Sequence, residues 1–477
     1  MKDLFVQLND LPDEILIYIF KKLYNGEVLY SLMGVNQRFD RIVHDKIFTR
    51  DLCLLEYCPI DDSTFPLPDP IIDRFCSKIL PEIGHHIKTL FLSRTSIERI
   101  LYATNYPNLN HLGLCDTEYK VAQSLFADKS SLTHMFKNQI SSLFLNLNDE
   151  DNPASMIGTT SVIFQEIFNK FTNLRCLKFN PSLFFLGTVN DAITYRTTIC
   201  SNLLELHVTL ISMEGFFYIL DGLFDQLRIF YATIIDIHFR FSKPEHKKNI
   251  YNYDELIVLL LRRMLNLEEL DLNIIVNCDQ KFIDGNTLKK DILIYMLQLY
   301  KFTFNICSII NHHDQINFSS NEHIQNTFKN ISNNQIINSI NHFQEERYSQ
   351  CHIYSYPYKW KIYNNITNNF RGGLFTNVTR VSLYDECPFE YEFFLRIQIS
   401  FPFMKELTIK NRKAQKYKQF ITSNNNSQTL SIIKYPNLTR LDLSYPHDDY
   451  LELFLFDTNM SLPINLHLCV NYQSLEM

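Results

Sequence analysis

The chain has 477 residues, a formal net charge of −7 and a sequence pI of about 6.1. Its hydrophobic fraction of 46% and aromatic fraction of 14% supply enough apolar side chains for a large core in about two or three domains. General binding of nucleic acids or of anionic membranes requires a basic surface, so the acidic balance argues against both functions.

The N-terminal segment carries the pattern of short amphipathic helices. Pro12 stands at the start of the first helix, where its missing N–H costs nothing, and Asp13 follows in the first turn, where the helix dipole favours an acid. Apolar residues then recur at helical spacing: Ile15, Leu16, Ile19, Phe20 and Leu23. The pattern predicts a second helix over residues 27–33, ended by Gly34, and a third over residues 36–47.

Three short helices in about 40 residues form a module that rarely stands alone without disulfides, a metal or a partner. The apolar stripe of the first helix is also wider than one small core needs. Part of this stripe should therefore face another protein.

The residues at these positions resemble the F-box motif. The matching residues are Leu11-Pro12, Glu14-Ile15-Leu16, Ile19-Phe20, Leu23, Val35-Asn36 and Phe39. The resemblance implies an F-box helical domain over residues 1–50 that binds the Skp-type adaptor of cullin–RING ubiquitin ligases. By resemblance, the adaptor contacts are Leu11, Pro12, Ile15, Leu16, Ile19, Phe20, Leu23 and Val35. The alternative is a plain N-terminal helical cap on the domain that follows.

A proline-rich stretch comes after the helical module. Residues 59–70 contain four prolines and cannot form a regular helix. We place a domain boundary in or near this stretch. Residues 51–84 are expected to form a linker and the first helical turn of the next domain.

From about residue 85 an apolar triplet recurs, with the form apolar-x-x-apolar-x-apolar. Its instances are Ile87-Leu90-Leu92, Leu109-Leu112-Leu114, Ile140-Leu143-Leu145, Leu174-Leu177-Phe179, Leu203-Leu206-Val208, Leu227-Phe230, Leu267-Leu270-Leu272, Leu299-Phe302-Phe304, Val378-Val381-Leu383, Met404-Leu407-Ile409 and Leu438-Leu441-Leu443. The last two positions of each triplet alternate with polar residues, which predicts a short half-buried strand. Helical patterns often lie between these strands, and such a recurring interval is typical of a solenoid.

The triplets resemble divergent leucine-rich repeats. The clearest instances begin at Asn108, Asn266 and Asn437, each followed by leucines at the family spacing. The resemblance implies an α/β fold in which residues 85–477 form an irregular leucine-rich-repeat solenoid with a parallel sheet on its inner face. One more degenerate strand is expected near residues 351–356. The alternative is an ordinary α/β domain with leucines spaced by chance.

Two segments of the solenoid region are markedly polar. Residues 311–341 are rich in Asn, Gln, Ser and His, and residues 423–428 follow a basic run at 410–418. Both segments are expected to be loops or insertions. The basic run is also compatible with a nuclear-localisation signal or an acidic partner, although a solvated loop is the commoner case.

The sequence offers no pattern of catalytic or metal-binding residues. It contains no phosphate-binding Gly-rich loop and no nucleophile-elbow motif. The adjacent pairs His85-His86 and His312-His313 have no Cys or carboxylate at ligand spacing. We expect no enzyme activity, no catalytic residue, no metal and no cofactor.

The eleven cysteines are scattered and include no C-x-x-C pair, which favours free thiols in a reducing compartment. No signal peptide is visible and no transmembrane span is expected. Together these features predict a cytoplasmic or nuclear protein.

The two resemblances together imply a substrate-recognition subunit that recruits a target protein to a cullin–RING ubiquitin ligase. The alternatives are a repeat scaffold whose F-box serves assembly without ubiquitination, and an enzyme with an unrecognised site. Residues between the core positions of each strand should face the inner surface, where they are mixed in charge and suit a polar protein surface. Target contacts are expected at Asp271, Arg380, Tyr384, Lys410, Arg440 and Asp442. The alternative is that these positions only confer solubility.

Overall fold

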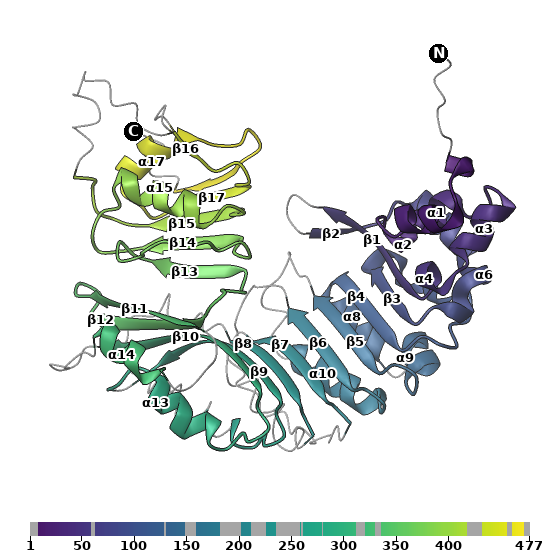
Figure 1. Ribbon diagram of the computed structural model, residues 1–477, viewed down its shortest axis with the longest axis horizontal. Coiled ribbons are helices and arrows are strands. Elements are labelled where there is room, and N and C mark those ends of the chain that lie inside the picture. The colour runs from purple at the N-terminus through teal and green to yellow at the C-terminus, as the bar shows by residue number, and fades with distance from the viewer. Residues whose placement is uncertain are drawn as a thin grey trace, which may run out of the picture. The chain divides into compact units, whose positions relative to one another are not determined.

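The protein is a mixed α/β chain in which a helical module precedes large sheets (Figure 1). This computed structural model describes residues 8–58, 63–127, 130–147, 159–181, 202–210, 226–234, 258, 261–278, 280–311, 320–329, 335–416, 432–455 and 460–471. The chain divides into two compact units. The first consists of residues 1–248, 256–271 and 295–301, and the second of residues 249–255, 272–294 and 302–477. Within the described residues, no helix is both long enough and apolar enough to cross a membrane.

Residues 8–50 form the three helices that the sequence predicts, with the third one broken in two, preceded by a short 3-10 helix. They are η1 (Leu8–Asp10), α1 (Asp13–Phe20), α2 (Asn25–Leu32), α3 (Gln37–Val43) and α4 (Lys46–Thr49). Gly34 has a φ of +81° and lets the chain turn between α2 and α3. Asn36 caps α3 by accepting from Phe39 N–H at 2.8 Å. Asp45 caps α4 by accepting from Ile47 N–H at 2.9 Å, which separates this turn from α3.

The first unit contains a sheet that begins directly after these helices. Its strands are β1 (Asp51–Cys58), β2 (Ser63–Pro66), β3 (Thr89–Ser93), β4 (His111–Thr117), β5 (Ser142–Leu147), β6 (Cys176–Pro181), β7 (Glu205–Leu210) and β8 (Ile229–Ile234). They follow the order β2-β1-β3-β4-β5-β6-β7-β8. The β1–β2 pair is antiparallel, and every pair from β1–β3 to β7–β8 is parallel.

The expectation of a linker over residues 51–84 is corrected, because the first strand of this sheet, β1, lies within that segment. Leu52 and Leu54 are fully buried, while Asp51 and Cys53 are exposed. This period of two is that of a half-buried strand, and β1 pairs in parallel with β3. The remainder of the segment is largely helical, with α5 (Asp69–Arg74), the π-helical turn η2 (Phe75–Ile79), α6 (Leu80–Ile83) and η3 (Gly84–His86).

Further helices of the first unit lie between its strands. They are η4 (Arg94–Ser96), α7 (Ile97–Leu101), α8 (Tyr119–Phe126), α9 (Ser131–Phe136) and α10 (Thr159–Lys170). Phe126 of α8 and Phe171, just after α10, meet edge to face at 6.0 Å. Aromatic packing of this kind joins the end of α8 to the end of α10.

Two strands begin in the first unit and continue in the second. They are β9 (Glu269–Asn277) and β10 (Lys301–Asn311). The second unit then adds α13 (Gly285–Leu288), η7 (Lys289–Leu293), α14 (Asn321–Thr327), β11 (Ile336–Phe343) and β12 (Tyr348–Ser355). Strand β12 lies between β10 and β11 and is antiparallel to both.

A five-stranded parallel sheet completes the second unit. Its order is β13 (Ile362–Ile366), β14 (Arg380–Tyr384), β15 (Glu406–Lys410), β17 (Arg440–Leu443) and β19 (His467–Val470). The helices α15 (Tyr391–Ser400) and α17 (Asp448–Leu455) contribute Phe394 and Tyr450 to its core. The short strands β16 (Ile433–Lys434) and β18 (Met460–Ser461) form a separate pair.

The prediction that the apolar triplets form strands is confirmed, since each of the eleven has its last positions in a strand. The eight leucines at the central triplet position are buried: Leu90, Leu112, Leu143, Leu177, Leu206, Leu270, Leu407 and Leu441. Two further expectations are corrected, one on the single repeat domain and one on the direction of a strand. The region 85–477 is divided between two units, and the strand expected near residues 351–356 is antiparallel because a four-residue turn at 344–347 closes a hairpin.

Within the polar segment at residues 311–341, α14 and most of β11 replace the expected loop, while residues 312–319 and 330–334 lie outside the described residues. Amide side chains here bind backbone rather than solvent. Asn321 Oδ1 accepts from Ile340 N–H at 2.9 Å, and Gln325 Nε2 donates to Ile336 O at 2.9 Å. The second polar segment, 423–428, lies outside the described residues.

Candidate functional site

The helical module presents apolar side chains to solvent on α1 and on the turns that follow α1 and α2. Ile15, Ile19, Leu23 and Val35 are between 37% and 56% exposed. Of the other predicted contacts, Pro12 is exposed and Leu11 is half-buried. Further exposed apolar residues, which the motif comparison did not single out, are Leu8, Tyr18 and Tyr24. Exposed apolar side chains that gather into a patch are typical of interaction sites in soluble proteins.

Two of the eight predicted contacts do not reach the surface. Leu16 is fully buried and Phe20 is 2% exposed. The Phe20 ring packs edge to face on Phe39 at 6.0 Å and on Phe48 at 6.4 Å. Both side chains therefore hold the module together, and six predicted contacts remain available to a partner.

Arg38 of α3 fixes the chain that leads into α1. Its Nη1 donates to Asn9 O at 2.6 Å and its Nη2 donates to Leu11 O at 2.5 Å. Its Nε donates to Asp13 Oδ1 at 2.7 Å, and Arg41 donates to the other oxygen at 2.9 Å. The hydrogen bond from Arg38 is the main reason that the pKa of Asp13 lies below its usual value. This clamp sets the position of Leu11 and Pro12 relative to α1.

The helical module also matches a known family. An F-box-like family model matches residues 8–55. The matched residues include all the helices from η1 to α4 and the first half of β1. They are the residues that expose the apolar surface, so the F-box-like domain and the candidate adaptor site coincide.

Two comparisons cover the whole chain, one with curated proteins and one with solved structures. No curated protein matches the sequence. A chain in a crystal structure of the Rad7 and Elc1 complex in yeast is similar at 10% sequence identity, with 98% of this chain and 94% of that chain covered. The TM-score of this match is 0.23.

Five of the six predicted target contacts lie on one face of the five-stranded sheet. Parallel register places Arg380, Glu406 and Arg440 in one row across β14, β15 and β17. Tyr384 and Lys410 form a neighbouring pair, and Asp442 is next to Thr408. These side chains are half-buried or exposed, while the alternate leucines point into the core. The sheet thus has a polar face suited to a protein partner.

The sixth predicted contact is corrected. Asp271 lies on β9 in the first unit and is only 8% exposed. A carboxylate that is buried in this way offers little surface to a target, so we remove it from the candidate set.

Sequence reasoning missed a polar network across the strands of the first unit. Glu269 on β9 accepts from Lys301 Nζ at 2.6 Å, from Tyr231 OH at 2.7 Å and from Tyr300 OH at 2.7 Å. These bonds hold the pKa of Glu269 down at about 2. Beside it, the Tyr231 ring lies 4.4 Å from that of His207. Only the strand register brings these residues together.

The described residues show no cluster of three or more His, Cys, Asp or Glu side chains that could hold a metal ion. The nine cysteines whose side chains the structure describes are free thiols. Burial raises the pKa of the Cys307 thiol to about 12, so this thiol is not poised as a nucleophile at neutral pH.

Proposed function

We propose that the chain is a non-catalytic substrate-recognition subunit of a cullin–RING ubiquitin ligase. The observation that carries this proposal is the F-box-like match over residues 8–55, on helices whose apolar side chains stay exposed. The F-box-like domain docks on a Skp-type adaptor through Leu11, Pro12, Ile15, Ile19, Leu23 and Val35, and the adaptor links it to a cullin. Burying such side chains at the centre of an interface supplies most of its binding energy.

The remainder of the chain holds the target protein. In this proposal the parallel strands are divergent leucine-rich repeats, which is supported by the position of the eleven triplets in strands and by the parallel register of most of them. The polar face of β14, β15 and β17 is the docking surface, centred on Arg380, Tyr384, Lys410, Arg440 and Asp442. Interfaces of regulated complexes are commonly polar, with Tyr and Arg as anchors.

The mechanism is one of proximity. The chain adds no chemical group to ubiquitin transfer. It holds a target lysine near a charged ubiquitin carrier, which raises the effective concentration of one relative to the other. The protein acts in the cytoplasm or nucleus, with neither nucleic acid nor membrane as a partner, which agrees with its net charge of −7.

Affinity purification of the full chain from native lysate, read by mass spectrometry, tests the proposal. We expect a Skp-type adaptor and a cullin in stoichiometric amounts. Recovery of the adaptor without a cullin would favour a scaffold that does not promote ubiquitination. Recovery of neither would contradict the adaptor site itself.

A further inference from the structure

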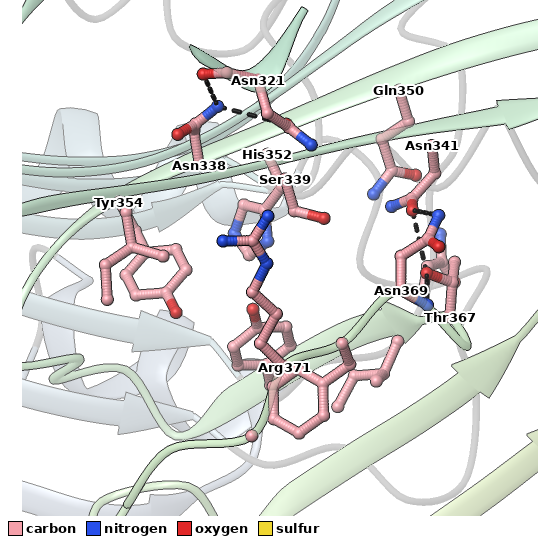
Figure 2. A pocket seen from close by; sticks show the side chains of 16 residues that line it. Asn321, Asn338, Ser339, Asn341, Gln350, His352, Tyr354, Thr367, Asn369 and Arg371 are labelled. Atoms are coloured by element: carbon pink, nitrogen blue, oxygen red, sulfur yellow. Dashed lines mark hydrogen bonds between the residues drawn. The ribbon is translucent and has the colours of Figure 1, made fainter. Parts of the chain in front are cut away.

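A cavity of about 290 Å³ lies within the second unit (Figure 2). One wall is a single face of the β11/β12 hairpin, formed by the cross-strand pairs Ile337–Tyr354, Ser339–His352 and Asn341–Gln350. The opposite wall comes from residues 363–372, which belong to β13 and the segment after it. The volume is at the small end of ligand pockets, so it suits one side chain with an adjoining peptide unit better than a large cofactor.

One buried amide oxygen on the hairpin wall lacks a partner, and a neighbouring amide has an unused donor among the described residues. Gln350 is 3% exposed, and its Oε1 is buried with no hydrogen bond. Asn341, its cross-strand neighbour, is 5% exposed. Its Oδ1 accepts from Thr367 Oγ1 at 2.8 Å and from Asn369 Nδ2 at 3.1 Å, while no bond from its own Nδ2 is present among the described residues. Burying polar atoms without partners is costly, so these groups fit a ligand that supplies both a donor and an acceptor.

His352 adds a second acceptor beside them. Its Nε2 donates to Asn305 Oδ1 at 2.5 Å, because Asn305 uses its Nδ2 to donate to Asn273 and to Tyr358 OH. Burial lowers the pKa of His352 to about 4, so the ring is neutral and Nδ1 carries a lone pair. The hairpin wall therefore carries both acceptor atoms, on Gln350 and His352, and a donor, on Asn341. A peptide group, which has one donor and one acceptor, can pair with such a set.

The charge of the cavity is positive. No carboxylate occurs among its sixteen lining residues, and Arg371 is the only side chain there that is charged at neutral pH. Arg371 is exposed and makes no ion pair within the described part of the chain. Figure 2 shows its side chain extending over the cavity. A guanidinium in this position pairs best with a planar or tetrahedral anion through more than one hydrogen bond.

We infer that this cavity binds a short segment of the target protein that carries an anionic side chain. The anion pairs with Arg371, and the adjoining peptide group pairs with Gln350 and Asn341. The inference rests on the proposed function, since it names the kind of target segment that such a receptor would hold. Both a carboxylate and a phosphorylated hydroxyl supply the required chemistry.

The test is binding of the purified full-length chain to a synthetic peptide array. Each peptide has eleven residues with randomised flanks and one of four central residues: glutamate, glutamine, phosphoserine or serine. The glutamate or the phosphoserine set should be bound at least fivefold more strongly than its neutral partner. The Arg371→Gln variant should lose this preference, and Gln350→Met should weaken binding to all sets at least threefold. Arg412→Gln, which changes another exposed arginine of the same unit, is the matched control and should bind as the parent does.

The outcomes separate the sources of the anion. A preference for phosphoserine over serine alone assigns a phosphate, and a preference for glutamate over glutamine alone assigns a carboxylate; either supports the cavity. Equal binding of all four sets, or a preference that survives Arg371→Gln, overturns it. Because the array needs no adaptor, failure of adaptor binding in the lysate experiment leaves this result independent. A thermal melt of Arg371→Gln that matches the parent shows that loss of peptide binding is not a loss of fold.

Discussion

Arg38 and Asp13 are joined across the helical module by a hydrogen bond of 2.7 Å from Nε to Oδ1. The same guanidinium binds two backbone carbonyls of the chain before α1. One side chain thus ties α3 to the entry of α1, where two predicted adaptor contacts, Leu11 and Pro12, are located. The position of the candidate adaptor site depends on this clamp as well as on the apolar core beneath it.

Arg38→Ala should loosen the segment of chain that leads into α1. It removes three charge-assisted hydrogen bonds, each of which contributes about 1.5–3 kcal/mol when geometry is good and less at a surface. We expect adaptor affinity to fall roughly tenfold, measured by titration of the purified adaptor. Arg41→Ala is the control, because Arg41 is a 73% exposed side chain whose only ion pair within the described residues is with Asp13, and such pairs contribute about 0–1 kcal/mol. Equal effects of the two changes would show that the clamp is not specific.

Leu11→Ala combined with Pro12→Ala should abolish adaptor binding while the sheets stay folded. Truncation of two contacts at an interface centre costs about 2 kcal/mol or more, a thirtyfold loss of affinity or greater. The measurement is a pulldown with purified adaptor, with circular dichroism to confirm the fold. Ile47→Ala is the matched control, since Ile47 is equally apolar and 46% exposed but lies on α4 outside the predicted contacts. Unchanged binding of the double variant would remove the basis of the F-box interpretation.

The sequence was sufficient to predict which side chains are buried where one face of an element is apolar. Strand positions such as Leu270 and Leu441 alternate with polar residues, and this period reports burial on one face. On α1 the same reasoning was only partly right. Residues 15–20 are apolar almost throughout, so spacing could not show that Leu16 and Phe20 pack inward while Ile15 and Ile19 remain outside.

The hairpin and the cavity were not predictable for a different reason. The turn at residues 344–347 contains no glycine, asparagine or proline, so it carries none of the usual turn signals. Gln350 and Arg371 both line the cavity. They are brought to it only by the pairing of β11 with β12 and by the path of the chain after β13. A pattern within one segment contains no information on such register.

Stability should depend on pH through Glu269. Hydrogen bonds from Lys301, Tyr300 and Tyr231 hold its pKa at about 2 in the folded chain, against a usual value of 4.5. Its contribution is therefore complete above about pH 4.5 and is lost as the pH falls toward 2. Glu269→Gln should lower the thermal midpoint at pH 6.5 by an amount corresponding to about 1–3 kcal/mol, and this difference should shrink at pH 3.5. A difference in thermal midpoint that is larger at pH 3.5 than at pH 6.5 would contradict this role of Glu269.

Lys301→Met provides a second check on the same network. Without the ammonium group the carboxylate loses its strongest partner, so the variant should lose most of the pH-dependent stabilisation that the parent shows between pH 6.5 and 3.5. The two tyrosines alone would leave a smaller effect. Thermal melts of the parent and both variants at the two pH values are sufficient to decide.

All eleven cysteines should be free thiols. In denaturant without reductant, titration with a thiol reagent should count eleven, and a clearly lower number would indicate disulfides. In the native chain Cys53 and Cys387 are the exposed thiols among the described side chains, and reaction at these two should precede reaction at Cys307 and Cys351. Burial raises the pKa of the latter two thiols, which keeps them protonated at neutral pH. Mass spectrometry of the labelled protein locates the first site.

Charge reversal on the polar face of the five-stranded sheet should release the target but not the adaptor. Arg380 and Arg440 flank Glu406 in one row of the sheet, so Arg380→Glu with Arg440→Glu converts an alternating row into three adjacent acids. A target that is complementary to the present row would meet like charges, which cost several kcal/mol at close range. Proteins that the parent retains from lysate and the variant loses are the candidate targets.

Two controls make this comparison decisive. Arg380 is half-buried, so Arg440→Glu alone, at an exposed position, separates loss of binding from loss of fold. Lys434→Glu reverses an exposed charge on β16, which belongs to a different sheet, and should keep both partners. If the double variant keeps the target as well as the adaptor, the row does not contact the target. If the Arg371→Gln variant then loses the target in the same assay, the cavity beside the hairpin is the main docking site and the sheet face is not.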